Sequence, residues 1–399
     1  MSKRCRPATR LVRAGIESDR QHNAVIPPIY LSTNFAFSEF GKKPPYDYTR
    51  SGNPTRDLLG EALADLEGGA GGVITATGMA AVTLVLQLLT PDDLVIAPHD
   101  CYGGTYRLLF RLQERGVVNA EFHNQTDDSI YAVIAERKPK LLWIETPSNP
   151  LLRIADIEKL AAAAHAVGAL VVVDNTFLSP ALQQPIALGA DIVVHSTTKY
   201  INGHSDVVGG AAIAKTPELH EKLVFWANAL GLTASPFDSY LALRGLRTLE
   251  ARLSVHLANT EALIDVLTDH KAVKKVYYPG LPSHPGHAVA KRQQSDFGAM
   301  LSFELHGGEA EVRALIDNLN HFSLAESLGG VESLIAHPAS MTHAAMDPEA
   351  RRRAGISDTL LRISVGIEDG EDLCNALEDA LDAVLELQAE HPALEVVNG

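Results

Sequence analysis

The sequence predicts an α/β protein with a mostly parallel sheet in a large domain and a smaller α+β domain towards the C-terminal end. From about residue 61, short runs rich in Val, Ile and Leu alternate with longer amphipathic or Ala-rich segments. Several of these runs are almost entirely apolar, which is typical of strands that are buried on both faces. After about residue 250, the alternation gives way to a long helical segment and to fewer strands.

The alternation of strands and helices favours parallel strands with helices on both faces of the sheet. The predicted strands of the large domain are residues 72–76, 94–98, 141–145, 170–174, 191–195 and 209–214. The predicted helices between them are residues 78–89, 106–115, 156–167 and 217–229. In the smaller domain we predict helices over 251–269 and 371–389, and strands over 299–305 and 361–365.

The length of 399 residues is enough for two or three structural units. We expect an N-terminal arm over residues 1–60, a large domain over 61–255 and a C-terminal domain over 256–399. The arm is rich in turn formers, and pairs such as Pro27-Pro28 and Asn53-Pro54 interrupt any regular pattern. An arm of this kind is expected to rest on another surface, such as that of a neighbouring subunit.

The composition excludes several classes of protein. The formal net charge of -15 would repel a nucleic acid, and solubility is the simpler explanation of this charge. The basic N-terminus is not followed by the apolar segment of a signal peptide, and no apolar run is long enough for a membrane span. Cys5, Cys101 and Cys374 have no metal-type spacing and fit a reducing compartment. We expect a cytoplasmic protein without a bound metal.

A lysine lies in the segment that directly follows the predicted strand 191–195, which reads Ser196-Thr197-Thr198-Lys199. Because burying an unpaired ammonium is costly, a lysine at a strand end commonly extends its amine to water. However, three hydroxyl residues precede Lys199, and hydroxyl groups at a strand end suit an anionic phosphate. A lysine in such a place can form an imine with an aldehyde cofactor.

Asp174 ends an apolar strand at the edge where ligands of α/β proteins bind. A carboxylate there can keep a pyridinium nitrogen protonated, which makes the ring a strong electron sink. A turn or N-cap aspartate is the alternative, and it is the commoner case for a lone Asp.

Two further strand ends carry weaker signals. The N–H groups of Gly78 and Met79 would point out of a helix start and suit a phosphate, although many strand–helix turns contain glycine. Tyr102 follows the strand 94–98, and its ring can either stack on a flat cofactor or pack on the surface. Arg362 interrupts the apolar strand 361–365 and needs a carboxylate, which can belong to the protein or to a substrate.

Together these segments resemble the Cys/Met-metabolism family of fold-type-I pyridoxal-phosphate (PLP) enzymes. The segment from Asp191 to Ser205 resembles the lysine signature of that family throughout, and such a long match is specific. The resemblance covers the chain from Pro27-Pro28 to Glu368-Asp369. It is strongest to bacterial members that join an O-acyl-L-homoserine, with O-succinyl as the expected donor, to L-cysteine to give L-cystathionine in methionine biosynthesis. Supporting stretches are residues 98–104, 226–228, 237–241 and 325–333.

The resemblance implies PLP as the cofactor and a homotetramer, a dimer of dimers with shared active sites. Lys199 would hold the cofactor covalently and move protons, Asp174 would pair with the pyridinium nitrogen, and Tyr102 would stack on the ring. Lys199 and Tyr102 are the expected catalytic residues. The residues expected at the phosphate are Gly78, Met79, Ser196 and Thr198, together with Tyr48 and Arg50 from across a subunit interface.

The resemblance also implies a substrate site. Arg362, with Ser327 and Asn149, would hold the α-carboxylate of the substrate, and Asn149 would also lie near the phenolic oxygen of the cofactor. Arg107 is the candidate for the carboxylate of a succinyl group. Further expected substrate residues are Glu326, which counts against a β-lyase, and Asn228.

One position departs from the pattern of the bacterial cystathionine-forming members. There a second arginine often follows the phosphate-binding one, whereas here Ser51 follows Arg50. The Arg-Ser-Gly-Asn-Pro form is similar to members that cleave cystathionine to cysteine, ammonia and 2-oxobutanoate. The direction of the reaction and the choice among succinyl, acetyl and phospho donors therefore stay open at this point. A non-catalytic descendant is disfavoured, because it would be expected to lose Lys199 or Asp174.

Overall fold

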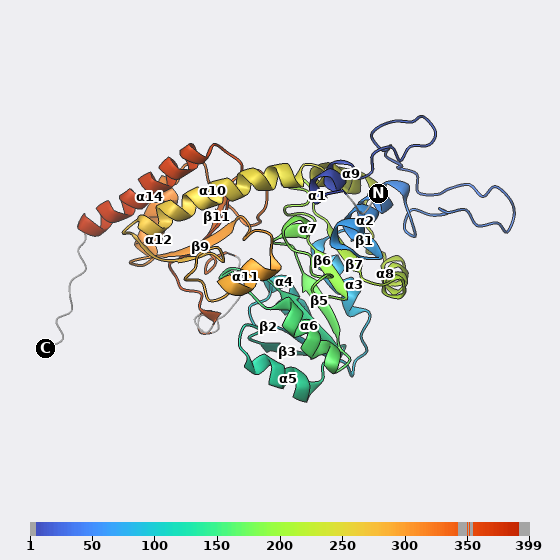
Figure 1. The fold of residues 1–399 in the computed structure, drawn as a ribbon, viewed down its shortest axis with the longest axis horizontal. Coiled ribbons are helices and arrows are strands. Elements are labelled where there is room, and N and C mark those ends of the chain that lie inside the picture. The colour runs from blue at the N-terminus through green and yellow to red at the C-terminus, as the bar shows by residue number, and fades with distance from the viewer. Residues whose placement is uncertain (1–4, 342–348, 350, 352–353, 391–399) are drawn as a thin grey trace. The chain divides into compact units, whose positions relative to one another are not determined.

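The computed structural model describes residues 5–341, 349, 351 and 354–390. The chain divides into two compact units, which are described separately below (Figure 1). Unit 1 consists of Met1–Ser148, Arg153–Ala251 and Pro285–Phe297, and unit 2 consists of Asn149–Leu152, Arg252–His284 and Gly298–Gly399. The division into an arm and two domains at residues 60 and 255 remains a prediction, and residues 1–4 and 391–399 of that division lie outside the described residues.

Unit 1 is built on a seven-stranded sheet with the strand order β1-β7-β6-β5-β4-β2-β3. The strands are β1 (Gly71–Thr75), β2 (Leu94–Pro98), β3 (Asn119–His123), β4 (Leu141–Glu145), β5 (Leu170–Asp174), β6 (Ile192–His195) and β7 (Gly210–Ala214). The strands from β2 to β6 pair in parallel, which confirms the predicted mostly parallel sheet. In contrast, β7 is antiparallel to both of its neighbours. No helix connects β6 to β7 in this described stretch, and a parallel return would need such a crossover.

The strand directions bring several strand ends to one edge of this sheet. Because β2, β4, β5 and β6 are parallel, their carboxyl ends lie at the same edge. β1 is antiparallel to β7, and β7 is antiparallel to β6, so the carboxyl end of β1 lies there too. Ligands of open α/β sheets bind at this edge.

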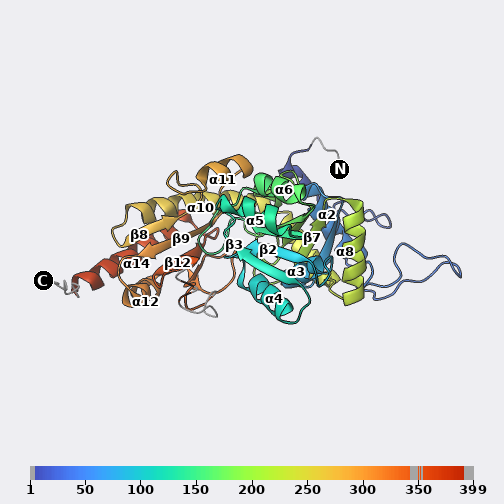
Figure 2. The ribbon, with the colours of Figure 1, turned by 90° about the horizontal axis from the view of Figure 1, so that it is seen from below.

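Helices cover both faces of the sheet. Figure 2 shows α3 and α4 on one face and α5 and α6 on the other. On the first face, Val172, Ile192 and Val194 pack into one apolar core with residues of α3, α4 and α8. The helices of unit 1 are α1 (Pro7–Val12), α2 (Pro54–Glu67), α3 (Gly78–Leu86), α4 (Gly103–Glu114), α5 (Ser129–Arg137), α6 (Ile157–Ala166), α7 (Ser179–Leu182), α8 (Pro217–Leu230), α9 (Pro236–Leu246) and α11 (His287–Gln293).

The region expected to be an irregular arm contains the start of a long helix. The pair Asn53-Pro54 was interpreted only as a break, but it begins α2. Oδ1 of Asn53 accepts hydrogen bonds from the N–H groups of Thr55 at 3.0 Å and Arg56 at 3.3 Å. Asn is a favoured N-cap, and proline at the first helical position lacks only an N–H that would have no partner in the helix. The same pair therefore ends one segment and starts the next.

Unit 2 contains a five-stranded sheet with the order β10-β11-β12-β9-β8. The central strand β12 is antiparallel to both β11 and β9, so the predicted α+β character is confirmed. Its strands are β8 (Val273–Tyr277), β9 (Met300–Leu305), β10 (Ser323–Leu324), β11 (Leu334–Ala336) and β12 (Leu360–Ser364). Its helices are α12 (Glu309–Asn318), α14 (Gly370–Glu390) and most of α10 (Leu249–Asp269). Among the helices of the described residues, none is long and apolar enough to cross a membrane.

Candidate cofactor and substrate sites

Polar residues at the ends of β4 and β5 lie side by side at the carboxyl edge of the large sheet. Glu145 is paired with Asp174 in the register of these two strands. Thr176 donates two hydrogen bonds to Oδ1 of Asp174, from its hydroxyl at 2.5 Å and from its N–H at 3.0 Å. The same hydroxyl oxygen accepts the N–H of Ser196 at 2.9 Å. Thr176 therefore links the aspartate to the beginning of the loop that carries the predicted lysine.

The N-terminus of α3 meets the end of β6 at Gly78 and Ser196. A Cβ atom added to Gly78 would lie 2.9 Å from Cβ and 3.1 Å from Oγ of Ser196, so a larger residue would not fit without a shift. Thr77 caps the helix, and its Oγ1 accepts the N–H of Ala80 at 2.9 Å. Helix N-terminal N–H groups and a serine hydroxyl are thus brought together, and both are suitable donors to a phosphate.

Lys199 lies half-buried in the turn that follows β6. Its N–H donates to the carbonyl oxygen of Ser196 at 3.3 Å, and its own carbonyl oxygen accepts the N–H of Gly203 at 2.8 Å. The hydroxyl of Thr198 is bonded to the backbone of Gly209, accepting its N–H at 3.0 Å and donating to its oxygen at 3.2 Å. The backbone of this lysine loop is therefore held on both sides of position 199.

Tyr102 immediately precedes α4 and is 49% exposed. Its N–H donates to Oε2 of Glu145 at 2.7 Å, which ties it to the ends of the central strands. A Cβ atom added to Gly104 would lie 2.5 Å from the Tyr102 ring and 2.8 Å from the sulfur of Met79. The ring and the start of α3 are therefore neighbours, and the exposed aromatic surface is suitable for stacking.

The carboxylates of Glu145 and Asp174 affect each other's ionisation. Burial, followed by the negative charge of Asp174, raises the pKa of Glu145 well above its usual range. Burial also raises the pKa of Asp174, while the hydrogen bonds from Thr176 and the charge of His195 act in the opposite direction. A cation beside Asp174 would favour the ionised carboxylate.

These residues fit the groups of PLP. Because Gly78 and Ser196 lie close together, the N–H groups at the start of α3 and a serine hydroxyl can bind the same anion. Asp174 provides a carboxylate that suits a ring nitrogen. Lys199 supplies an amine and Tyr102 an aromatic surface. The donors, the carboxylate, the amine and the ring all belong to unit 1.

In unit 2, Arg362 lies on the central strand β12 and is only 3% exposed. Its Nη1 donates to Oδ1 of Asn149 at 2.9 Å, and its Nη2 donates to the carbonyl oxygen of Ser327 at 2.8 Å. Both acceptors are neutral oxygens that fix the direction of the guanidinium. Ser302 of β9 supports the Asn149 loop by donating its hydroxyl to the carbonyl oxygen of Pro150 at 2.7 Å. The three residues predicted to hold a carboxylate are therefore brought together.

The other predicted residues form no part of these two groups. Arg50 donates from Nη1 to the backbone oxygen of Asn228 at 2.9 Å and to its Oδ1 at 2.8 Å. The Arg50 guanidinium also lies 5.5 Å from the ring centre of Tyr48, and both residues are exposed. Arg107, on α4, and Glu326, next to Ser327, are exposed as well.

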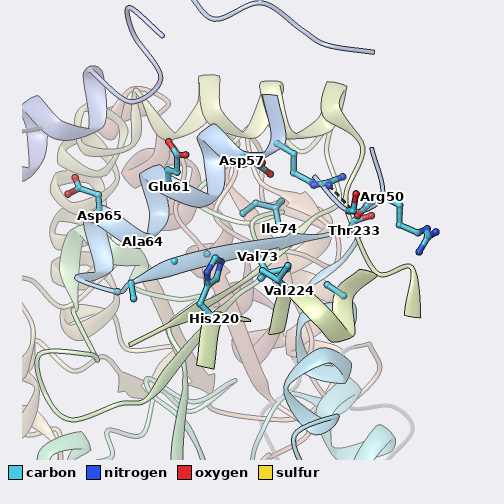
Figure 3. Close-up of a pocket in the computed structure, with 17 residues that line it drawn as sticks. Arg50, Asp57, Glu61, Ala64, Asp65, Val73, Ile74, His220, Val224 and Thr233 are labelled. Atoms are coloured by element: carbon cyan, nitrogen blue, oxygen red, sulfur yellow. Dashed lines mark hydrogen bonds between the residues drawn. The ribbon is translucent and has the colours of Figure 1, made fainter. Parts of the chain in front are cut away.

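Arg50 also lines a cavity of about 570 Å³ between α2, β1 and α8. Figure 3 shows Asp57, Glu61 and Asp65 along α2, with His220 pointing towards them from α8. Of the predicted site residues, this cavity contains Arg50 and not the residues at the strand ends.

Two residues bonded to the predicted ones were missed in the sequence. Glu145 ends a predicted strand as Asp174 does, and Thr176 lies two positions after Asp174, so both carried a readable signal. Glu67 was also missed, although it contacts the end of β6. No pattern in the sequence indicated this role, because Glu67 belongs to a helix that was not predicted. Its partner His195 is 128 positions away in the chain.

Comparison with known proteins identifies close relatives over nearly the whole length. Cystathionine gamma-synthase of Escherichia coli strain K12 is 56% identical over 377 residues, which cover 94% of this chain and 98% of the relative. The crystal structure of cystathionine gamma synthase from Xanthomonas oryzae pv. oryzae in complex with cystathionine has 63% identity and a TM-score of 0.94. That match covers 96% of this chain and 99% of the other. Cystathionine gamma-lyase of Dictyostelium discoideum is 47% identical, covering 94% of this chain and 97% of the relative.

The family model described as Cys/Met metabolism PLP-dependent enzyme matches residues 8–382. This match, together with the high identities, confirms the predicted resemblance, the fold-type-I architecture, the PLP cofactor and amino acids as the substrate class. The chain belongs to the Cys/Met-metabolism family of PLP-dependent enzymes.

Proposed function

We propose that this enzyme joins an O-acyl-L-homoserine, with O-succinyl-L-homoserine as the preferred donor, to L-cysteine, giving L-cystathionine and the released acid. The observation that carries the proposal is the 63% identity, over 96% of this chain, to a gamma synthase in complex with cystathionine. The identity to a gamma-lyase is lower, at 47%. At these identities the substrate chemistry is more strongly supported for cystathionine formation than for its cleavage.

In this proposal, the residues at the strand ends serve the cofactor. PLP, when bound, supplies an aldehyde and an electron-withdrawing ring that stabilises negative charge on the carbon next to the substrate amine. Lys199 would hold the aldehyde carbon through Nζ. Asp174 would face the ring nitrogen as a carboxylate, and Tyr102 would stack on the ring. The N–H groups of Gly78 and Met79 and the hydroxyl of Ser196 would donate hydrogen bonds to the phosphate.

The displaced Lys199 amine must be neutral to act as a base. A site that is partly dry disfavours the charged form of an amine and so favours its neutral form. Nζ would take the proton from Cα of the substrate, and a second proton, removed from Cβ, would return to carbon before release. Over the whole reaction the C–O bond at Cγ is replaced by a C–S bond. The acyl group departs as a carboxylate, and the cysteine thiol provides the sulfur and gives up its proton.

Arg362 holds the α-carboxylate of the substrate in this scheme. Asn149 and Ser327 fix the plane of its guanidinium through the bonds at 2.9 and 2.8 Å. A planar guanidinium matches a carboxylate with two parallel hydrogen bonds, which sets both the position and the direction of Cα. A substrate held in this way has its reacting carbon in a defined position and direction.

Cleavage of cystathionine is the second candidate, and Ser51 is the observation that favours it. Its hydroxyl lies 2.7 Å from both Oδ1 of Asp47 and the carbonyl oxygen of Tyr48. Ser51 therefore belongs to a local turn and offers no positive charge to a succinyl group. We propose that Arg107, an exposed cation on α4, serves that carboxylate instead.

A cytoplasmic location is part of the proposal. Cys5, Cys101 and Cys374 are all free thiols. Burial raises the pKa of Cys101 well above its usual range, which disfavours the reactive thiolate. These are features of a protein from a reducing compartment.

A substrate panel tests the direction of the reaction. We expect O-succinyl-L-homoserine with cysteine to give cystathionine at a higher kcat/KM than cystathionine alone gives 2-oxobutanoate, with O-acetyl and O-phospho donors measured alongside. The products are identified by mass spectrometry. If the holoenzyme cleaves cystathionine but makes none from any acyl donor, the second candidate is correct.

Lys199→Ala should remove the visible absorbance band of the bound cofactor and all turnover, because Nζ forms the covalent bond. Lys215→Ala is the matched control, since Lys215 also follows a strand of the same sheet and is exposed. The control should keep both the band and the activity. A band that persists in Lys199→Ala would show that another lysine binds the cofactor.

Arg362→Lys should lower kcat/KM for the acyl donor by roughly 30-fold, equivalent to about 2 kcal/mol, because lysine cannot form two parallel bonds to a carboxylate. The cofactor band should be unchanged. The control is Arg313→Lys, at an exposed arginine that pairs with Glu309 on α12, and it should behave as the wild type. Unchanged steady-state kinetics in Arg362→Lys would assign the α-carboxylate to another residue.

We also propose a homotetramer in which Tyr48 and Arg50 reach the phosphate site of a neighbouring subunit. Both side chains are exposed, and the arm around them carries further exposed apolar side chains, including Leu31, Phe37 and Phe40. Large exposed apolar groups are typical of surfaces that another chain covers.

Mixed subunits test this sharing of sites. Arg50→Ala and Lys199→Ala should each be inactive alone, whereas their co-expression should restore about a quarter of the wild-type activity. Half of the random dimers are then mixed, and each mixed dimer has one intact site. Light scattering should give four times the mass of the chain. A fully active monomer, or no restored activity, would contradict the proposal.

A further inference from the structure

A fully buried histidine and carboxylate lie behind the strand ends that carry the cofactor site. Nε2 of His195 is 2.6 Å from Oε1 of Glu67, and both side chains have an exposure of 0%. His195 is the last residue of β6 and directly precedes Ser196, whereas Glu67 is the last residue of α2. The contact therefore connects a helix outside the sheet to the strand that leads into the lysine loop.

The same carboxylate oxygen also binds the end of the neighbouring strand. Oε1 of Glu67 accepts a hydrogen bond from Nδ2 of Asn175 at 3.0 Å, and Asn175 directly follows Asp174. Gln183 holds the other end of this amide by donating from Nε2 to Oδ1 of Asn175 at 3.0 Å. Oε1 of Glu67 thus contacts both Asn175, which follows Asp174, and His195, which precedes Ser196.

The contact between Glu67 and His195 lies on the face of the sheet opposite to the core formed with α3 and α4. Val194 belongs to that core. Because side chains alternate along a strand, His195 points to the other face, where Glu67 of α2 meets it. Glu67 therefore acts on Asp174 and Ser196 through the backbone of β5 and β6.

Stability alone does not account for this pair. Oε2 of Glu67 and Nδ1 of His195 are buried and have no hydrogen-bond partner among the described residues. Such unsatisfied buried atoms cost free energy, and apolar residues of similar volume commonly stabilise a core as well as a buried ion pair does. What apolar residues would not provide is a directional bond to two strand ends at once.

We propose that Glu67, through His195 and Asn175, is a positioning residue that holds the ends of β5 and β6 at the spacing that PLP requires. The inference rests on the proposed roles of Asp174 at the ring nitrogen and Ser196 at the phosphate. The aromatic ring of the cofactor is rigid and its phosphate is attached through a short linker, so the distance between the ring nitrogen and the phosphate varies only within narrow limits. A carboxylate that binds both strand ends fixes the matching distance in the protein before the cofactor arrives. A preorganised site of this kind binds more tightly, because less order is lost on binding.

The charge of the pair supports the same role. The charge of His195 acts to lower the pKa of Asp174 against the larger effect of burial. Glu67 holds this histidine in place through the 2.6 Å contact. Loss of that contact would therefore leave both the strand end and the group that acts on Asp174 less firmly positioned.

The test compares the melting temperature of the full-length protein with and without bound PLP, together with the dissociation constant of PLP. Glu67→Gln keeps the size of the side chain but removes its charge. It should raise the PLP dissociation constant about tenfold or more, as loss of a supporting residue behind a ligand site commonly does. The gain in melting temperature on PLP binding should shrink accordingly. The visible circular dichroism of the bound cofactor should change, since its orientation is less restricted.

Asp191→Asn is the matched control. Oδ2 of Asp191 lies 2.9 Å from Nε2 of His165 and accepts the N–H of Val171 at 2.9 Å. This is also a histidine–carboxylate pair, but it lies at the opposite ends of β5 and β6. The control should lower the melting temperatures of the apo and holo proteins equally and leave the PLP affinity unchanged.

A second variant keeps the proposal falsifiable if Glu67→Gln fails to fold. In the double variant Glu67→Met with His195→Leu, apolar residues replace the whole pair, so a folded protein is expected. It should bind PLP more weakly than the wild type does. Wild-type PLP affinity in either folded variant, with only an equal fall in both melting temperatures, would show that the pair is merely structural. None of these measurements needs a substrate, so a failure of the proposed reaction would be seen separately.

Discussion

The candidate cofactor site depends on the convergence of parallel strand ends at one edge of a sheet. β4, β5 and β6 run in the same direction, so Glu145, Asp174 and the lysine loop emerge side by side. β7 then returns antiparallel, and this leaves the stretch that contains Lys199 as a loop rather than a crossover helix. Short hydrogen bonds through Thr176 connect the aspartate to Ser196. The direction of the strands thus brings a carboxylate, an amine and donors for a phosphate to one edge of the sheet, although these groups are far apart in the sequence.

Electrostatics at this edge favour a cationic ring. Two carboxylates occupy neighbouring strand ends, and burial raises the pKa of each. A protonated pyridine nitrogen would reduce the repulsion between the two carboxylates. Their negative charge would in turn stabilise the protonated nitrogen. In unit 2 the chemistry is complementary, because the buried Arg362 is directed by two neutral oxygens and suits an anion. Unit 1 therefore contains the groups proposed for the cofactor, and unit 2 contains those proposed for an amino-acid carboxylate.

The family relationship explains why the fold alone does not determine the reaction. Proteins named gamma-synthase and gamma-lyase share 56% and 47% identity with this chain over almost its full length. The residues proposed at the strand ends would have the same tasks in either reaction. Discrimination must come from residues that contact the acyl group or the incoming thiol. Ser51 and Arg107, which differ in charge and lie on separate elements, are the positions proposed above for that choice.

The sequence by itself determined the fold class and the order of most strands and helices, because apolar periodicity is a local pattern. Lys199 and Asp174 stay predictions, drawn from the lysine segment and from a strand end. The sequence missed α2, since Asn53-Pro54 reads equally as a break and as a helix start. The residues alone also left open whether the carboxylate partner of Arg362 belongs to the protein or to a substrate. The structure bonds its guanidinium to neutral oxygens of Asn149 and Ser327, the two residues that the family resemblance groups with it. Only the tertiary structure decided that Glu67 binds both Asn175 and His195. These contacts join residues more than a hundred positions apart, and no local pattern encodes a bond that forms only when helices and strands pack together.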